Sequence, residues 1–148
     1  MHTLRFAIHV NAPRKQVWHA MLDDATYREW TSAFSPGSYY KGSWEQGSSI
    51  EFLGPDPEGK TAEGGMFAEI AENRPYEFLS TRHLGVIENG VKKPWGADKP
   101  VYENYTFADK DGGTDVTVEL TGIPDEYMAM YDDTWPKALA KLKEIAER

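Results

Sequence analysis

The 148-residue chain contains no cysteine. Disulfide bonds, thiolate catalysis and cysteine-based zinc or iron–sulfur sites are therefore excluded. Histidine is scarce, with 4 residues, and no two of them stand at a metal-binding spacing. The chain also lacks a P-loop, a G-x-G-x-x-G and a G-x-S-x-G motif. Nucleotide, metal and serine-hydrolase chemistry thus have no support in the sequence, and we expect neither a bound metal nor a cofactor.

The chain also has few positively charged residues and no long apolar run. The chain has 16 Lys and Arg residues against 24 Asp and Glu, which gives a formal net charge of -8 at pH 7. An acidic surface without a basic stripe repels phosphate backbones and anionic lipids, so we expect no nucleic-acid or membrane partner. No apolar run could span a bilayer, and the N-terminus lacks the features of a signal peptide. The expected compartment is the cytoplasm.

Aromatic residues, in contrast, are plentiful at 13% of the chain, with 5 Trp, 8 Tyr and 6 Phe. Aromatic side chains bury large areas in cores and also line ligand pockets, so composition alone leaves both uses open. The length suits one domain, which we place over residues 1–148.

The first third of the chain predicts one strand and two short helices. Residues 3–10 alternate apolar and polar side chains, as in a half-buried strand. Pro13 suits the start of a helix, which we expect to end at Leu22. A second short helix is expected over 23–30, with Asp23 or Asp24 as its cap.

The middle of the chain predicts six more strands. Segments 38–44 and 48–54 flank a short turn, and so do 62–73 and 76–84. Segments 101–109 and 114–122 are joined by the sequence KDGG, a strong hairpin signal. Short turns between about seven strands imply an antiparallel meander.

The last 25 residues, 124–148, predict an amphipathic helix. Its apolar residues recur every three or four positions and are Met128, Tyr131, Trp135, Leu139, Leu142 and Ala146. Pro136 removes one backbone hydrogen bond, so we expect a kink or break near 132–135. Strands followed by a helix indicate an α+β fold in which a curled antiparallel sheet surrounds the C-terminal helix.

This order of elements resembles the helix-grip fold of the START-related, birch-pollen-allergen-like superfamily (SRPBCC). More narrowly, it resembles the branch that includes the C-terminal domain of activators of the heat-shock protein 90 ATPase. The segments that carry the resemblance are FAIHVNAPRKQVWHAMLDD (6–24), YREW (27–30), GGMFAEIAENRPYEFLSTR (64–82), YTFADKDGGTDVTVEL (105–120) and TWPKALAKLKEIAE (134–147).

The resemblance implies several functions, because the superfamily includes lipid carriers, hormone receptors, polyketide cyclases and co-chaperone domains. We expect a binding module that holds a hydrophobic or aromatic small molecule between sheet and helix, since no catalytic motif is present. A polyketide cyclase/dehydratase-like enzyme and a chaperone ATPase-activator-like interaction domain are the alternatives. A chaperone and a second copy of the chain are therefore further candidate partners.

Two polar side chains are candidates for work in such a pocket. Glu103 shares one strand face with Val101, Tyr105 and Phe107, which carries the carboxylate inward. A buried carboxylate needs a donor, and either Arg82 or His83 on the preceding strand could supply it, but not both. Glu103 and His83 would then serve as a polar ligand contact or an acid/base pair, or else as a merely structural hydrogen bond.

Five aromatic and two methionine side chains could either pack in a solid core or line a pocket. In a helix-grip fold these side chains would line the cavity, and Met128 and Met130 would form an adaptable wall. The aromatic members are Trp30, Phe67, Tyr105, Tyr131 and Trp135.

The segment 85–99 is longer than a hairpin needs and departs from the simplest form of the family pattern. We expect Glu88–Gly90 to form a small turn within it. Loops at the end of a curled sheet lie near the cavity mouth. Trp95 is therefore either part of a lid over the ligand or a side chain that only fixes the loop to the sheet.

Overall fold

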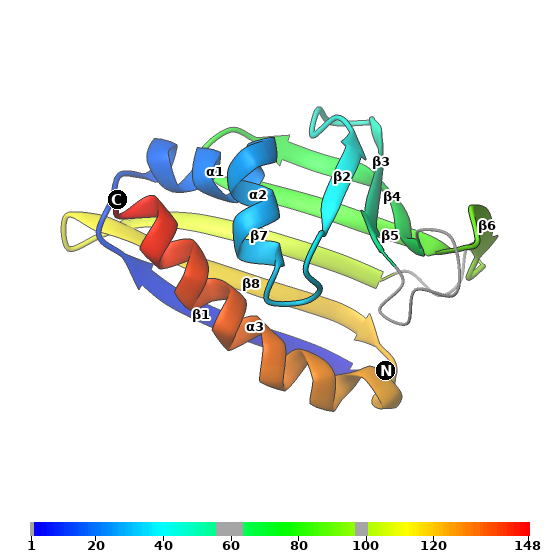
Figure 1. Ribbon diagram of the computed structural model, residues 1–148. Coiled ribbons are helices and arrows are strands. Elements are labelled where there is room, and N and C mark those ends of the chain that lie inside the picture. The colour runs from blue at the N-terminus through cyan, green and yellow to red at the C-terminus, as the bar shows by residue number, and fades with distance from the viewer. Residues whose placement is uncertain (1, 56–63, 97–100) are drawn as a thin grey trace.

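The computed structural model describes residues 2–55, 64–96 and 101–148. Its helices are α1 (Arg14–Leu22), α2 (Asp24–Thr31) and α3 (Asp125–Ala146). Its strands are β1 (His2–Val10), β2 (Tyr39–Gly42), β3 (Ser49–Gly54), β4 (Gly64–Arg74), β5 (Phe78–Glu88), β6 (Val91–Pro94), β7 (Val101–Lys110) and β8 (Gly113–Ile123). The expected α+β helix-grip fold is confirmed, with one strand more than the sequence suggested (Figure 1).

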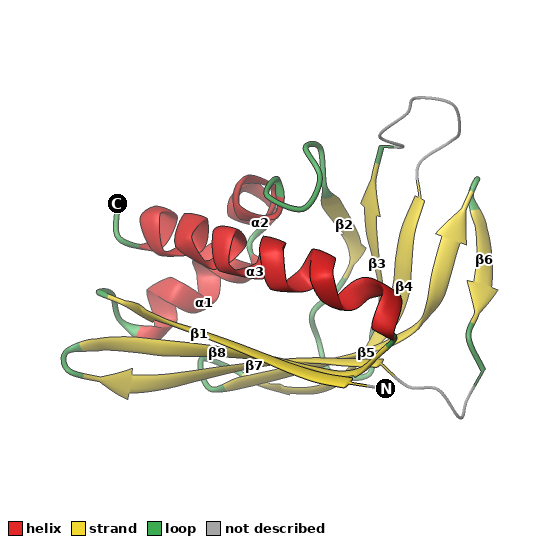
Figure 2. Cartoon of the chain, turned by 90° about the horizontal axis from the view of Figure 1, so that it is seen from below, coloured by secondary structure: helices red, strands yellow, loops and turns green. Residues whose placement is uncertain are grey.

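All strands belong to one antiparallel sheet in the order β1-β8-β7-β5-β4-β3-β2. Strand β6 lies off this path and pairs with β5 beyond the point where β7 begins. The three helices lie on one side of the sheet, and β2, β3 and β4 bend up beside α3 (Figure 2). A strongly twisted sheet of this kind encloses space between its concave face and the helices.

Helix α1 begins directly after Pro13, as the sequence predicts. The end of α1 is held by aromatic side chains from other elements. The Tyr40 hydroxyl and the Trp44 indole both donate to the carbonyl oxygen of Leu22, at 2.7 and 3.0 Å. The buried Trp30 on α2 donates its indole N–H to the carbonyl oxygen of Met21 at 2.9 Å. These bonds satisfy carbonyl groups that a helix end leaves free.

Helix α3 runs from Asp125 to Ala146 without interruption. Of the kink or break predicted near 132–135, the break is therefore wrong, and the kink stays a prediction. Pro136 is exposed, and its ring faces solvent rather than a neighbouring element. The packing of the following turns, with Leu139 and Leu142 fully buried, holds the helix together despite the missing hydrogen bond. In the described part of the chain, no helix is both long and apolar enough to cross a membrane.

The two halves of α3 pack differently. Every buried residue of the helix lies at or after Thr134. The first half, from Asp125 to Asp133, has only half-buried side chains, such as Met128 and Tyr131, among exposed ones. The C-terminal half therefore closes the core, whereas the N-terminal half leaves space between itself and the sheet.

The segment after β5 contains more regular structure than expected. Strands β5 and β6 form a hairpin, and its two central residues, Asn89 and Gly90, have φ angles of 52° and 77°. Positive φ at both positions is the geometry of the tight turns that fit the twist of a hairpin, and Asn-Gly is the preferred pair there. The turn expected at Glu88–Gly90 is thus confirmed, while the irregular segment is shorter than predicted. Residues 97–100 of that segment lie outside the described residues.

Candidate functional site

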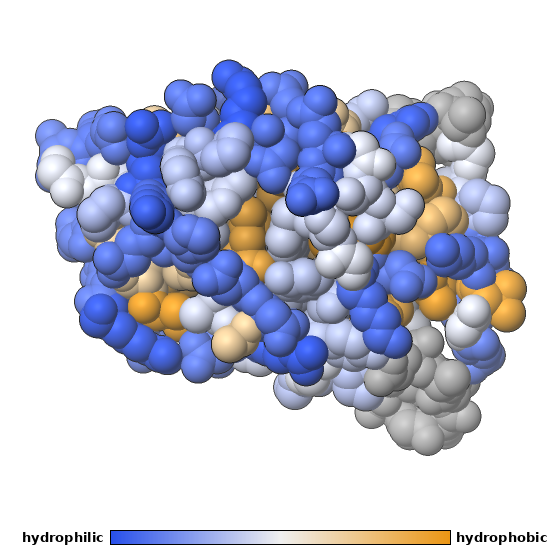
Figure 3. Space-filling view, turned by 90° about the horizontal axis from the view of Figure 1, so that it is seen from above, coloured by the Kyte–Doolittle hydropathy of each residue, from blue (hydrophilic) through white to orange (hydrophobic). Residues whose placement is uncertain are grey.

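A cavity of about 600 Å³ lies under the N-terminal half of α3. Its walls come from α2 and the loop after it, from β3, β4, β5 and β7, and from α3. Most of the side chains that line it are aromatic or aliphatic, and the largest are Tyr27, Trp30, Phe34, Phe52, Met66, Tyr105, Tyr131 and Trp135. Figure 3 shows that hydrophobic atoms also reach the surface toward the end of the molecule that carries β6.

The aromatic walls form one connected cluster rather than separate rings. Trp135 of α3 lies 5.9 Å from Trp30 and 5.0 Å from Phe34, measured between ring centroids. Tyr27 contacts Trp30 edge-on at 5.5 Å. Such edge contacts are the favoured arrangement for aromatic pairs and hold each ring in place. The cluster therefore gives the cavity a fixed hydrophobic wall.

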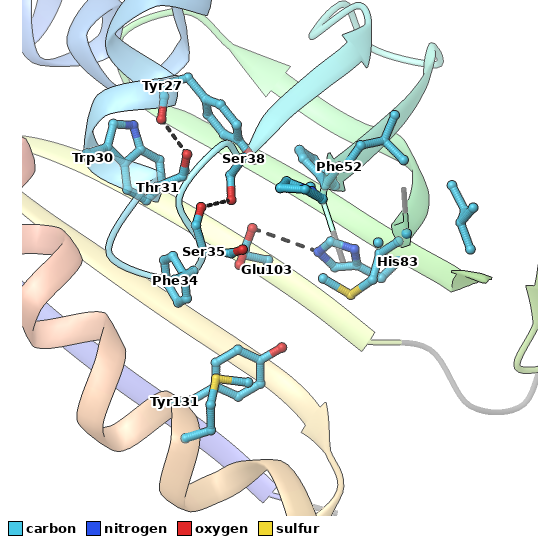
Figure 4. Close-up of a pocket in the computed structure, with 18 of the residues that line it drawn as sticks. Tyr27, Trp30, Thr31, Phe34, Ser35, Ser38, Phe52, His83, Glu103 and Tyr131 are labelled. Atoms are coloured by element: carbon cyan, nitrogen blue, oxygen red, sulfur yellow. Dashed lines mark hydrogen bonds and ion pairs between the residues drawn. The ribbon is translucent and has the colours of Figure 1, made fainter. Parts of the chain in front are cut away.

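Three polar side chains meet at the sheet side of this cavity. Two of them, His83 and Glu103, are seen in Figure 4. Tyr105 donates its hydroxyl to Oε2 of Glu103 at 2.8 Å. Nε2 of His83 lies 3.8 Å from the same oxygen, within ion-pair distance but too far for a hydrogen bond. The register places Arg82 on the other side of the sheet, where its guanidinium contacts Glu69 at 3.3 Å. Of the two donors predicted from the sequence, His83 is thus the one near Glu103.

The tyrosines of the site stay protonated over a wide pH range. Burial, and then the negative charge of Glu103, raise the pKa of Tyr27 and hold the pKa of Tyr105 well above its usual value. The same two causes raise the pKa of Tyr131 to about 12. Neutral phenols remain hydrogen-bond donors, so the site keeps its donor groups at physiological pH.

Two buried nitrogen atoms in the cavity walls have no hydrogen-bond partner within the described residues. They are Nε1 of Trp135 and Nδ1 of His83, in side chains that are 2% and 4% exposed. An unpaired buried polar group is costly and uncommon in folded proteins. Trp30, whose indole nitrogen is bonded, provides the contrast within the same cluster.

A second cavity of about 480 Å³ adjoins the first and shares with it Gly65, Met66, His83, Glu103, Met130 and Tyr131. Trp95 lines this second cavity together with Val86 and Val101. The backbone N–H of Trp95 donates to the carbonyl oxygen of Leu84 at 2.9 Å, which fixes the residue to β5. Trp95 is therefore attached to the sheet and also faces a cavity, and its role as a lid stays a prediction.

The structure brings together most of the residues that the sequence singled out. Those that line the first cavity are Trp30, His83, Glu103, Tyr105, Tyr131 and Trp135. Phe67 and Met128 line neither cavity. The Phe67 ring lies beneath the Lys92 ammonium, 5.5 Å from it, while Met128 packs against the core.

Other lining residues were not anticipated from the sequence, among them Tyr27, Phe34, Phe52 and Met66. Phe52 does carry a signal, because it alternates with the buried Ile50 along β3. Phe34 lies in a loop, where no periodicity marks the side chains that turn inward. Among the described residues, no three His, Asp or Glu side chains are placed to hold a metal ion.

A protein-family model described as "Activator of Hsp90 ATPase homolog 1-like protein" matches residues 11–147. The chain belongs to this family. The resemblance inferred from the sequence is thereby confirmed for the Hsp90 activator-like branch. Comparison with curated proteins finds no match.

Solved structures similar to this member of the Hsp90 activator-like family share its fold at low sequence identity. Protein CV1439 from Chromobacterium violaceum is 20% identical, with a TM-score of 0.71 and coverage of 100% of this chain and 99% of that one. CalU16 from Micromonospora echinospora is 16% identical, with a TM-score of 0.68 and coverage of 97% and 75%. The Aha1 dimer from Colwellia psychrerythraea is 15% identical, with a TM-score of 0.72 and coverage of 99% and 97%.

Proposed function

We propose that this protein is a binding module that holds a hydrophobic or aromatic small molecule in the cavity beneath α3. The observation that carries the proposal is the cavity of about 600 Å³ whose wall is a connected cluster of aromatic rings. Ligand sites in proteins are usually preformed hollows of about 300–1,000 Å³ with apolar walls and a few polar groups. Both the size and the lining of this cavity agree with that description.

The polar groups of the wall refine the proposal. Glu103 lines both cavities, and one of its oxygens accepts the hydroxyl of Tyr105. A few polar groups in an apolar pocket usually fix the orientation of a ligand through its own polar atoms. We therefore expect an apolar molecule with at least one polar atom rather than a pure hydrocarbon.

Thermal unfolding with a panel of hydrophobic and aromatic compounds tests the proposal. A ligand that binds only the folded protein raises the melting temperature in a concentration-dependent way. Replacing Met66, which lines both cavities, by Trp should fill the space and abolish this stabilisation. The matched control is Val91→Trp, because Val91 is 57% exposed and lines neither cavity. Stabilisation that survives Met66→Trp unchanged would place the ligand elsewhere and contradict the proposal.

A protein-interaction role is the second candidate, because the matching family carries the name of an ATPase activator. The structure from Colwellia psychrerythraea is described as a dimer, which makes a second copy of this chain another candidate partner. Affinity purification with the chaperone as bait tests the first idea, and sedimentation velocity tests the second. If the chaperone does not enrich this chain, and if the chain sediments as a monomer, both interaction roles are contradicted.

A further inference from the structure

The charge of the cavity walls carries an inference about the ligand. Among the described residues that line the two cavities, the acidic side chains are Glu88, Glu103 and Glu126, and none is a Lys or Arg. Glu88 and Glu126 are both exposed, and Lys93 contacts Glu88 at 2.7 Å. Glu103 is therefore the carboxylate inside the site, and it belongs to both cavities.

Glu103 has fewer partners than a largely buried carboxylate needs. Its side chain is 17% exposed, and its ion-pair neighbour among the described residues is His83, at 3.8 Å. The hydroxyl of Tyr105 occupies one acceptor position on Oε2. A carboxylate has about four acceptor positions, so several remain available toward the cavity. A carboxylate removed from water is stabilised by a further donor or a positive charge.

The aromatic rings around Glu103 favour the same kind of partner. Tyr27, Tyr131 and Trp135 line the cavity with Glu103, and the electron-rich faces of such rings attract cations. Figure 4 shows Tyr131, on α3, across the cavity from Glu103 and His83 on the sheet. A cation next to Glu103 would thus have the carboxylate on one side and rings on the others.

We propose that the ligand is a hydrophobic amine, bound as its ammonium ion with the charge at Glu103. Its apolar body lies against the aromatic wall formed by α2 and α3. The inference rests on the proposed binding function and adds the sign of the ligand charge. Carboxylate and phosphate ligands are disfavoured, because no described Lys or Arg of the cavities offsets their repulsion by Glu103.

A matched series of probes tests the sign of the charge on the unmodified protein. Phenylbutylamine, phenylbutanol and phenylbutanoate share one apolar body and differ in the charge of the head group at neutral pH. Titration calorimetry at constant pH and ionic strength should rank the amine first, the alcohol about tenfold or more weaker, and the carboxylate last. This ranking needs no variant and so does not depend on a mutant that folds.

Glu103→Gln then identifies the group responsible, because it removes the charge and keeps an oxygen for the Tyr105 hydroxyl. Amine affinity should fall about 10- to 100-fold, while alcohol affinity stays the same. Glu69→Gln is the control, since it changes the net charge equally and Glu69 lines neither cavity. Equal binding of amine and alcohol, or an unchanged amine affinity in Glu103→Gln, overturns the inference and leaves the proposed function intact. If none of the three probes binds but another compound of the thermal-unfolding panel does, the inference fails and the proposed function stands. If no compound binds, both fail.

Discussion

At the scale of single residues, burial and the Glu103 carboxylate act in the same direction on three tyrosines of the pocket. Both favour the protonated phenol of Tyr27, Tyr105 and Tyr131, because a phenolate would be poorly solvated and close to a negative charge. The pKa of each tyrosine is therefore higher in the folded protein than in the unfolded chain. This difference links the stability of the fold to pH in the alkaline range.

We predict that Tyr131→Phe weakens the alkaline loss of stability. The pKa of Tyr131 is raised to about 12 in the folded state and is near 10 when unfolded. Its stabilising contribution is complete below about pH 10 and disappears as the pH rises through about 12. Urea denaturation across this range should show a decrease in unfolding free energy that is smaller in the variant by about 2 kcal/mol. The control is Tyr127→Phe, because Tyr127 lies on the same helix but is 44% exposed. If the unfolding free energy falls equally with pH in the unmodified protein and in both variants, the raised pKa of Tyr131 is contradicted.

The sequence predicted the polar residues of the site better than the apolar residues that line it. Alternation along β7 placed Glu103 beside Tyr105 on the inner face, and the structure has both in the cavity. The choice between Arg82 and His83 needed the register of β5 against β7, which a sequence pattern does not fix. Phe67 and Met66 are adjacent and both apolar, so alternation could not tell which of them faces inward.

At the scale of elements, helix α3 tolerates a proline because tertiary packing compensates for it. Pro136 has no N–H for the carbonyl oxygen of Asp132, yet the helix continues on both sides. The sequence rule predicted a kink or a break, since it considers the local hydrogen bond alone. The buried turn that includes Trp135 and Leu139 supplies the missing stabilisation.

We predict that Pro136→Ala stabilises the protein. Alanine restores one backbone hydrogen bond and has the highest helix propensity, and Pro136 is exposed, so no core packing is lost. The unfolding free energy should rise by about 1–3 kcal/mol in chemical denaturation. Pro124→Ala is a suitable control, because Pro124 occupies the N-cap position, where proline costs no helical bond. If Pro124→Ala raises the unfolding free energy as much as Pro136→Ala does, the position of Pro136 inside the helix is not the cause of the gain.

The hairpin of β5 and β6 shows what element-level patterns miss. The Asn89–Gly90 pair was readable as a turn, since these two residues adopt positive φ more easily than others. The strand after it, Val91–Pro94, has two lysines and a proline and is exposed throughout, so no apolar alternation marked it as a strand. This strand pairs with β5 through backbone hydrogen bonds, which the order of apolar and polar side chains does not predict.

At the scale of the whole molecule, the core joins segments from both ends of the chain. Phe6 of β1 stacks on Trp135 of α3 with ring centroids 6.4 Å apart, and Trp135 also contacts Trp30 of α2. We predict a single cooperative unfolding transition for this reason. Tryptophan fluorescence and far-ultraviolet circular dichroism should give coincident urea curves. Two separate transitions would mean that the sheet and α3 are independent units.

The pairing of β1 has a consequence for the order of events during synthesis. Strand β1 pairs with β8 along almost its entire length and packs against α3, so both of its neighbours are made after the other strands. While the ribosome extends the chain, the apolar face of β1, with Leu4 and Phe6, stays without its native cover. Nascent chains that expose such segments are prone to aggregation. We therefore expect β1 to be the segment of this chain that is most exposed to aggregation until α3 has emerged.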